Sequence, residues 1–241
     1  MGAKETIIAM IPARIGSTRL PKKNLALING EPLISYAVKA AQASGVFDRI
    51  IINTDDPVFG KIADRYGVEF YLRPEALGSS TTKSDDVVLD FINKHPGDIV
   101  CWINPTSPLQ TGDEIKNVVL HFQNQELDSL ITVIDQQVHA NFNKAPLNYK
   151  TDELFAQTQD LVPVELFVYS VMMWRTENFV RAYQTQGHAF FVGKVGFYPV
   201  SRLSAIIIKR KEDLKLAEFI LKSLEDASDD PVQYDPLAED G

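Results

Sequence analysis

The chain has 241 residues, of which 45% are hydrophobic and 23% are charged, with a formal net charge of -8 and a single cysteine, Cys101. This length predicts one main domain with an inserted element, and one cysteine excludes an intramolecular disulfide. The acidic balance argues against a nucleic acid partner, which needs a broad basic face, and no apolar run approaches the roughly 18 residues of a membrane span.

The first half of the chain alternates short β-branched runs with stretches of helical periodicity, which is the βαβ pattern of a parallel sheet covered on both faces. The helix expected after the first strand ends at Gly45, a favourable C-cap. Asp55 or Asp56 can cap the second helix, with Pro57 at its first position, and Ser84 is expected to cap the third. The predicted strands are residues 6–11, 49–54, 68–72, 98–103 and 129–134, and the predicted helices are 32–45, 57–67, 84–95 and 114–125.

The pattern weakens after Asp135. Residues 136–165 are polar and weakly periodic, so we interpret them as an inserted flap. Beyond the flap the sequence predicts an apolar core strand over 166–174, a helix over 176–187, an irregular strand pair over 188–200, a strand over 205–209 and a helix over 211–226. The acidic residues 226–241 are expected to form a disordered tail. We therefore expect one α/β domain over 1–225, with a Rossmann-like, parallel, mixed-edge sheet and helices on both faces.

A basic loop, "IPARIGSTRLPKKN", follows the first predicted strand. It places four cations within ten positions of an acidic chain: Arg14, Arg19, Lys22 and Lys23. Such a loop lies at the carboxyl end of the strands, where open α/β sheets bind ligands, and Gly16 and Ser17 would allow phosphate oxygens to approach closely. The spacing does not match a Walker A motif, and the chain has no G-x-G-x-x-G. From charge and position alone, the loop could either bind a phosphorylated ligand or form a solvated turn.

Four segments then carry a resemblance to a known family. They are "IPARIGSTRLPKKN", "NGEPLISYAVKAAQASGVFDRIIINTDD", "VEFYLRPEALGSSTTKSDDVV" and "NPTSPLQTGDEI". In this respect the chain resembles the acylneuraminate cytidylyltransferases over residues 6–135. The resemblance implies a fold of the nucleotide-diphospho-sugar transferase type and transfer of CMP from CTP to an acidic nonulosonic sugar, with Mg²⁺ and release of pyrophosphate. It also implies a homodimer formed through residues 136–165. Separately, the N-terminal sequence lacks the pattern of a secretory signal peptide, so we expect a cytoplasmic protein.

The same resemblance assigns site residues. It places the following around the nucleotide: Ala13, Arg14, Ser17, Lys23, Asn24, Arg73, Gly78, Ser79 and Thr81. Arg14 and Lys23 would contact the phosphates as catalytic cations, while Asn24 and Arg73 would face the base. Asn104 would contact the acceptor sugar. A surface ion pair is the alternative for Arg73, and an Asx turn beside Pro105 is the alternative for Asn104.

The chain departs from the family where metal is expected. The family holds Mg²⁺ with an Asp-x-Asp just before the last helix, and this sequence has Ile206, Ile207, Ile208 and Lys209 there. Magnesium prefers oxygen ligands, so these residues cannot hold it. The four histidines, His95, His121, His139 and His188, have no zinc-like spacing either.

A second departure concerns the sugar side. Thr158 replaces an arginine of the family, Tyr169, Ser170 and Val171 replace Asn-Gly-Ala, and Met173 replaces a tyrosine. Lys144, Lys150 or Arg175 could restore the lost positive charge. Two functions therefore remain open. One is an active transferase, its metal held by the triphosphate, water and Asp55, Asp56, Asp85 or Asp213. The other is a catalytically impaired nucleotide-binding homologue that acts as a regulatory or partner subunit.

Overall fold

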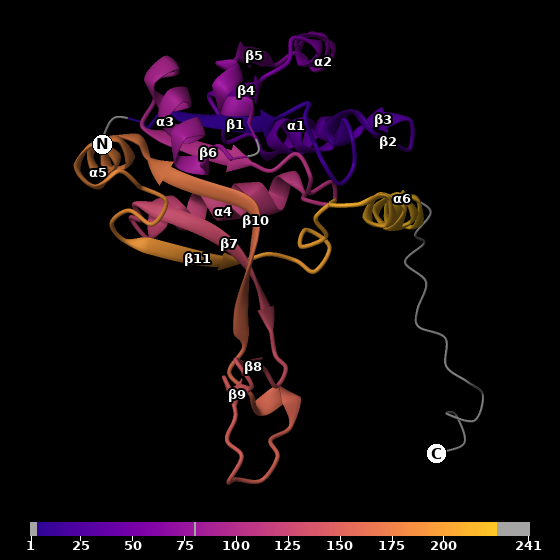
Figure 1. Ribbon diagram of the computed structural model, residues 1–241, viewed down its shortest axis with the longest axis vertical. Coiled ribbons are helices and arrows are strands. Elements are labelled where there is room, and N and C mark those ends of the chain that lie inside the picture. Colours follow the sequence, from indigo (N-terminus) through magenta and orange to yellow (C-terminus); the bar gives the residue numbers. More distant parts are fainter. Residues whose placement is uncertain (1–3, 80, 226–241) are drawn as a thin grey trace.

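The computed structural model of the protein describes residues 4–79 and 81–225, so the expected tail at 226–241 lies outside it. Seven strands form one sheet in the order β11-β7-β10-β6-β1-β4-β5 (Figure 1). They are β1 (Ile7–Ala13), β4 (Arg49–Thr54), β5 (Glu69–Leu72), β6 (Ile99–Ile103), β7 (Ser129–Gln136), β10 (Val164–Arg175) and β11 (Val195–Pro199). The expected α/β fold with a predominantly parallel sheet is confirmed. The antiparallel strand is β10, which pairs with β7 and β6 inside the sheet and not at the edge where we expected it.

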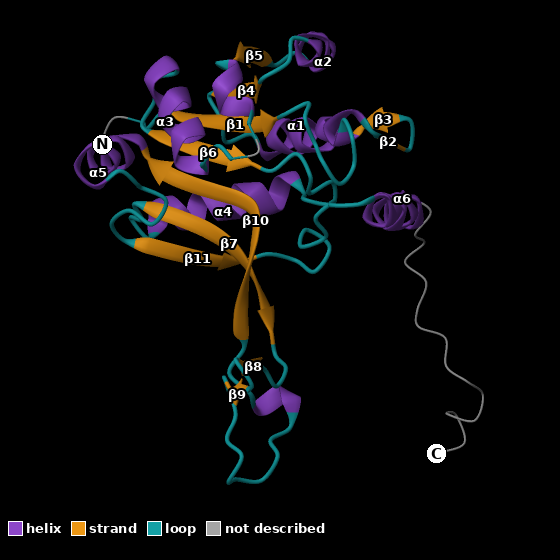
Figure 2. Cartoon of the chain, in the orientation of Figure 1, coloured by secondary structure: helices purple, strands orange, loops and turns teal. Residues whose placement is uncertain are grey.

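Helices cover both faces of the sheet (Figure 2). Side chains of β1 alternate between two cores because successive residues of a strand point to opposite faces. Ile7, Ala9 and Ile11 pack in the core of α1 (Leu33–Ser44), α2 (Val58–Tyr66) and α4 (Gly112–Asn124). Ile8 and Met10 belong to the core beneath α3 (Ser84–Lys94) and α5 (Thr176–Gln186). The strand is therefore buried on both sides, as its continuous apolar sequence predicts.

A third, smaller core joins the last helix to the start of α1. The basic loop ends in a 3₁₀ turn, η1 (Lys23–Leu25), followed by the short hairpin β2 (Leu27–Ile28) and β3 (Glu31–Pro32). Ile28 and Leu33 pack with Ile208 and with Ala217 of α6 (Lys211–Glu225). This contact holds the basic loop beside the segment that precedes α6.

The flap, residues 136–165, extends away from the sheet. Strands β7 and β10 run out together as an arm, and the flap lies at its end (Figure 1). Besides the ends of those strands it contains the short hairpin β8 (Asn141–Phe142) and β9 (Ala145–Pro146) and one 3₁₀ turn, η3 (Thr158–Asp160). Its outer part consists mainly of loops (Figure 2).

Four details of the predicted elements are wrong. Residues 205–209 form no strand: Ile208 is buried against α6 and its N–H donates to the Thr106 carbonyl, 2.8 Å away. The expected strand pair over 188–200 consists of β11 alone. Ser84 lies inside α3, whose N-cap is Lys83, and Pro57 is the N-cap of α2. The predicted Gly45 cap is confirmed, with φ of 65°.

Cys101 lies in β6 and is fully buried. Burial raises the pKa of its thiol, so the reactive thiolate form is disfavoured. Over residues 4–79 and 81–225, no helix combines the length and the apolar character that crossing a membrane requires.

Candidate functional site

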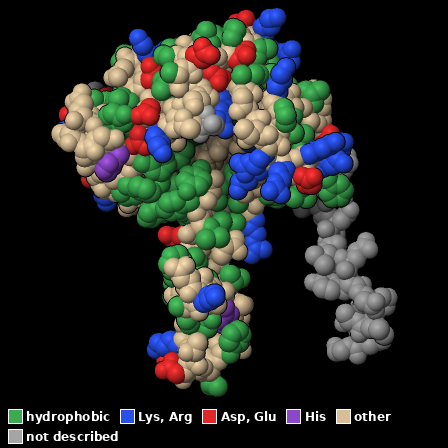
Figure 3. All heavy atoms as spheres, viewed as in Figure 1, with side chains coloured by type: hydrophobic (Ala, Val, Ile, Leu, Met, Phe, Trp, Pro, Cys, Tyr) green, Lys and Arg blue, Asp and Glu red, His purple; other side chains and the backbone are tan. Residues whose placement is uncertain are grey.

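A cavity of about 350 Å³ opens at the carboxyl ends of β1 and β6. The hollow is visible near the centre of the molecular surface, and Lys and Arg side chains gather along one side of it (Figure 3). Open α/β sheets bind ligands at this end of their strands because the connecting loops diverge there. The cavity contains eight of the ten residues that sequence analysis selected: Ala13, Arg14, Ser17, Lys23, Asn24, Arg73, Ser79 and Asn104.

The basic loop supplies three cations to this cavity. Arg14, Arg19 and Lys23 line it. Lys22, the fourth cation of the loop, is exposed, has a left-handed φ of 52° and does not line the cavity, so three of the four loop cations contribute to it. The Lys23 ammonium donates to the Ile208 carbonyl oxygen at 2.9 Å, which ties the loop to the segment before α6.

The charge of Lys23 is destabilised by its surroundings. Burial, followed by the nearby charges of Arg19 and Arg14, lowers the pKa of Lys23 from 10.5 to about 8. An anionic ligand would stabilise the charged form of Lys23, because its negative charge would offset both the loss of solvation and the repulsion by Arg19 and Arg14. The depressed pKa therefore agrees with the position of Lys23 in a site for a phosphate group.

Two buried polar side chains in the cavity lack partners for one of their atoms. Arg73 is 5% exposed, and one of its terminal nitrogens donates to the Asn53 carbonyl at 2.9 Å, but its Nε has no partner. Asn24 is 4% exposed, and its Oδ1 has no partner either. Because an unsatisfied buried polar atom costs about 1–3 kcal/mol, such atoms in a cavity point to a polar ligand. The surface ion pair considered for Arg73 is wrong, since its guanidinium is buried.

Gly78 and Thr81 do not line the cavity, although their neighbours Leu77, Ser79 and Thr82 do. A Cβ on Gly78 would lie 2.3 Å from a carboxylate oxygen of Asp55, so only glycine allows this approach. Thr81 contacts Ser79, whose hydroxyl lies 2.9 Å from the Thr81 hydroxyl. Both residues therefore shape the wall that carries Ser79.

Asn104 follows β6 and makes the Asx turn that we considered as its alternative role. Its Oδ1 accepts from the N–H and the hydroxyl of Thr106, at 3.0 and 2.8 Å. Its Nδ2 donates to the Tyr169 carbonyl at 3.1 Å, within the irregular part of β10, where Tyr169 has a left-handed φ of 59°. Asn104 nevertheless lines the cavity, so the turn fixes a side chain that a ligand can reach.

The metal position that the resemblance implies does not fit a metal. Ile208 is fully buried in the core with α6, and Lys209, a cation, lines the cavity. Magnesium needs oxygen ligands, and neither side chain provides one. Among residues 4–79 and 81–225, no group of three His, Cys, Asp or Glu side chains could hold a metal ion.

The four aspartates considered as replacement ligands serve the fold. None of them lines the cavity within the described part of the chain. Each accepts backbone N–H groups: Asp55 from Ile15, Asp56 from Val58, Asp85 from Ala189 and Phe190, and Asp213 from Lys209 and Arg210. Their carboxylates therefore hold the basic loop, begin α2, fasten the loop before β11 and begin α6.

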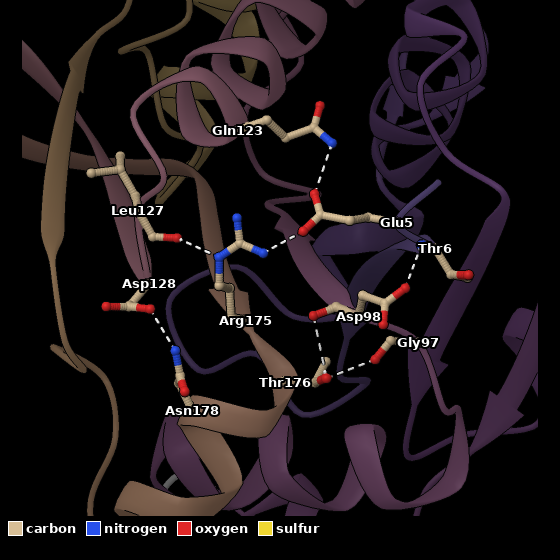
Figure 4. Close-up of polar contacts among 10 residues, drawn as sticks. All are labelled: Glu5, Thr6, Gly97, Asp98, Gln123, Leu127, Asp128, Arg175, Thr176 and Asn178. Carbon is tan, nitrogen blue, oxygen red and sulfur yellow. Dashed lines mark hydrogen bonds and ion pairs between the residues drawn. The ribbon is translucent and has the colours of Figure 1, made fainter. Parts of the chain in front are cut away.

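Arg175 does not replace the lost positive charge of the sugar side. It lies at the opposite end of the sheet, where its Nε donates to the Leu127 carbonyl at 3.0 Å and its Nη1 pairs with Glu5 (Figure 4). Lys144 and Lys150 lie in the flap, and Lys150 pairs with Glu153. Thr158 is in the flap as well, whereas Met172, Met173 and Trp174 are buried core residues, as predicted.

Sequence analysis missed several residues of the cavity. They include Lys83, Trp102 and Thr106, and Lys209 was considered only as a failed metal ligand. Lys83 is the N-cap of α3. A cation at a helix N-terminus opposes the helix dipole, so its position before a predicted helix could have marked it as a ligand contact.

Comparisons with known proteins agree on one family. A family model described as "Cytidylyltransferase" matches residues 8–222. An N-acylneuraminate cytidylyltransferase of Escherichia coli is 35% identical over 121 residues, which is 50% of this chain and 29% of that protein. An N-acylneuraminate cytidylyltransferase of Streptococcus agalactiae is 24% identical over 215 residues, which is 86% of this chain and 51% of that protein. The chain thus spans about half or less of the length of these relatives.

A solved structure shares the fold over nearly the whole chain. It is a CMP:2-keto-3-deoxy-manno-octonic acid synthetase complexed with CTP, with a TM-score of 0.67 and 14% identity, and the match covers 91% of this chain and 99% of that one. At this identity the likeness shows the fold alone.

Proposed function

Because the chain belongs to the cytidylyltransferase family, we propose that it transfers CMP from CTP to an acidic sugar of the nonulosonic type and releases pyrophosphate. The anomeric hydroxyl oxygen of the sugar forms a bond to the α-phosphorus of CTP. The bond from that phosphorus to the bridging oxygen of the β-phosphate breaks, and the hydroxyl proton passes to solvent. The observation that carries the proposal is the cationic cavity at the carboxyl ends of β1 and β6.

We assign roles by position and chemistry. Arg14 and Lys23 stabilise the negative charge that develops on the phosphate oxygens, since nucleotidyl transfer depends mainly on positioning and on charge neutralisation. Ala13, Ser17 and Ser79 enclose the nucleotide. The free Asn24 Oδ1 and Arg73 Nε suit cytosine, which offers an amine donor and carbonyl and ring-nitrogen acceptors.

We assign Asn104 to the acceptor sugar. It lines the cavity at the end of β6, beside Trp102, and is held there by its own turn. An acidic acceptor is supported by the names of the relatives, which specify an acylneuraminate. We also place the reaction in the cytoplasm, where CTP is available.

The test combines catalysis with binding. Purified protein is mixed with CTP and a panel of nonulosonic acids, and pyrophosphate is measured, while thermal shifts are recorded with CTP, UTP, GTP and ATP. A ligand at one hundred times its Kd stabilises a protein by about 2.7 kcal/mol, so binding of CTP is readily seen. Release of pyrophosphate that requires both CTP and an acceptor supports the proposal. Stabilisation by CTP without pyrophosphate release in the presence of any acceptor of the panel contradicts the transferase function.

The affinity for CTP should fall between pH 7 and pH 9. With a pKa of about 8, Lys23 is about nine-tenths charged at pH 7 and about one-tenth charged at pH 9. The contribution of Lys23 to the free energy of unfolding changes in the opposite direction. Between pH 8 and 10.5 the unfolded chain keeps the Lys23 proton that the folded chain has lost, so Lys23 makes the ligand-free protein more stable as pH rises. Calorimetric Kd values across this range test the prediction, and Lys23→Met should flatten the profile. An equally steep profile in that variant would assign the effect to another group.

We further propose that the protein is a homodimer joined through the flap. The flap exposes large apolar side chains, among them Leu154 and Phe155, which are 97% and 80% exposed. Exposed apolar groups gathered on one projecting element are typical of a protein contact.

The variant carrying Leu154→Ser and Phe155→Ser should therefore be monomeric. Light scattering after size exclusion measures the mass, and Phe219→Ser, an exposed apolar position on α6, serves as the matched control. The flap is not the dimer contact if the double variant keeps the dimeric mass, or if the control loses it as well.

A further inference from the structure

The charged side chains that line the cavity are all positive. Six side chains contribute: Arg14, Arg19, Lys23, Arg73, Lys83 and Lys209. Among the described residues no Asp or Glu lines it. The described lining therefore attracts a polyphosphate and offers no carboxylate ligand to a divalent cation.

The cations come from separate elements that the fold brings to one place. Arg14, Arg19 and Lys23 belong to the loop after β1, Lys83 precedes α3 and Lys209 precedes α6. Lys23 and the segment of Lys209 are joined directly, because the Lys23 ammonium donates to the carbonyl of Ile208 at 2.9 Å. The main-chain N–H of Lys209 is in turn held by Asp213 at 2.7 Å. The Lys209 side chain is therefore presented to the cavity by an anchored backbone.

We infer that this cavity binds the nucleoside triphosphate as the free polyanion, with Lys23 and Lys209 supplying the positive charge that a divalent ion would otherwise supply. The inference rests on the proposed function and deepens it, since it specifies the ionic form of the substrate. Ammonium and guanidinium groups make charge-assisted hydrogen bonds to phosphate oxygens, and they need no carboxylate to hold them in place.

The first test compares CTP binding with and without magnesium. Calorimetry gives the Kd of the full chain for CTP in EDTA and in excess MgCl₂. We expect the Kd in EDTA to lie within about fivefold of the value in MgCl₂, or below it, a difference of less than about 1 kcal/mol. Binding more than about fivefold weaker in EDTA overturns the inference and leaves the proposed function intact. Absence of CTP binding in both buffers overturns the proposed function itself.

The second test changes the charge at one position. Lys209→Asp should weaken CTP binding in EDTA by about tenfold or more, and MgCl₂ should restore part of the loss, because a carboxylate now faces the phosphates. Lys211→Asp makes the same change of charge in the first turn of α6, outside the cavity, and should alter the Kd by less than about twofold. Circular dichroism melts verify that both variants fold. Equal losses in both variants, or no loss in Lys209→Asp, would contradict the role of Lys209.

Discussion

Replacing Lys23 by methionine should lower kcat/KM for pyrophosphate release by about 10²–10³-fold, the usual effect of removing one preorganised group that stabilises charge in a transition state. The side chain is part of the cavity wall, and its ammonium is held 2.9 Å from the Ile208 carbonyl. Methionine keeps a similar length and removes the charge, so the loss measures the ammonium and not the packing.

The folded state should not suffer from this change. Burial and the charges of Arg19 and Arg14 disfavour the charged form of Lys23, so the methionine variant should melt at the temperature of the unmodified protein or above it. Lys22→Met is the matched control, since Lys22 is adjacent, exposed and outside the cavity. Its kcat/KM should change by less than about twofold. If the Lys23→Met variant retains more than a tenth of the kcat/KM of the unmodified protein, Lys23 does not stabilise the transition state as proposed.

Trp174→Ala should destabilise the protein by about 3–5 kcal/mol, as removal of a large aromatic core side chain generally does. Trp174 is fully buried in β10, its ring lies 5.7 Å from that of Phe179 and 5.5 Å from that of Phe190, and its Nε1 donates to the Phe190 carbonyl at 2.9 Å. The loss is a large share of the 5–15 kcal/mol by which domains are usually stable.

Urea unfolding followed by circular dichroism measures this loss. Trp174→Phe keeps an aromatic ring and removes the donor, so it should lie between the alanine variant and the unmodified protein. Phe219→Ala, on the exposed side of α6, should change the free energy of unfolding by less than about 0.5 kcal/mol. A loss of under about 1 kcal/mol in Trp174→Ala would show that β10 does not depend on this packing.

The alternating strands and helices were predictable because their signals are local. β1 and β6 are apolar throughout, and α1 ends at a glycine with φ of 65°. The basic loop could be selected for its charge and its place after a strand. The predictions that failed concern residues whose structure is set by contacts with parts of the chain that are distant in sequence. Ile208 belongs to an apolar run that resembles a strand, but it is buried by α6 and bonded to Thr106, and periodicity cannot distinguish these two forms of burial.

The capping errors have a similar cause. Serine favours the N-cap position, but Ser84 lies inside α3, and the neighbouring Asp85 accepts from the N–H groups of Ala189 and Phe190, more than a hundred positions away. The residues before β11 form a loop that Asp85 holds through these two bonds, and the Phe190 carbonyl of this loop accepts from Trp174 Nε1. Lys209 stands where the family has an aspartate, and its place in the cavity depends on the packing of the segment before α6 beside the basic loop, which the sequence does not show.

The burial of Cys101 makes the protein well suited to site-specific labelling. The sequence contains no other thiol, and this one is fully enclosed in β6 with its ionisation suppressed. A Phe219→Cys variant, at an exposed position on α6 outside the proposed flap contact, would react with a maleimide dye while Cys101 stays unmodified. Energy transfer between donor-labelled and acceptor-labelled copies would then report on the proposed dimer, without any change to the native core.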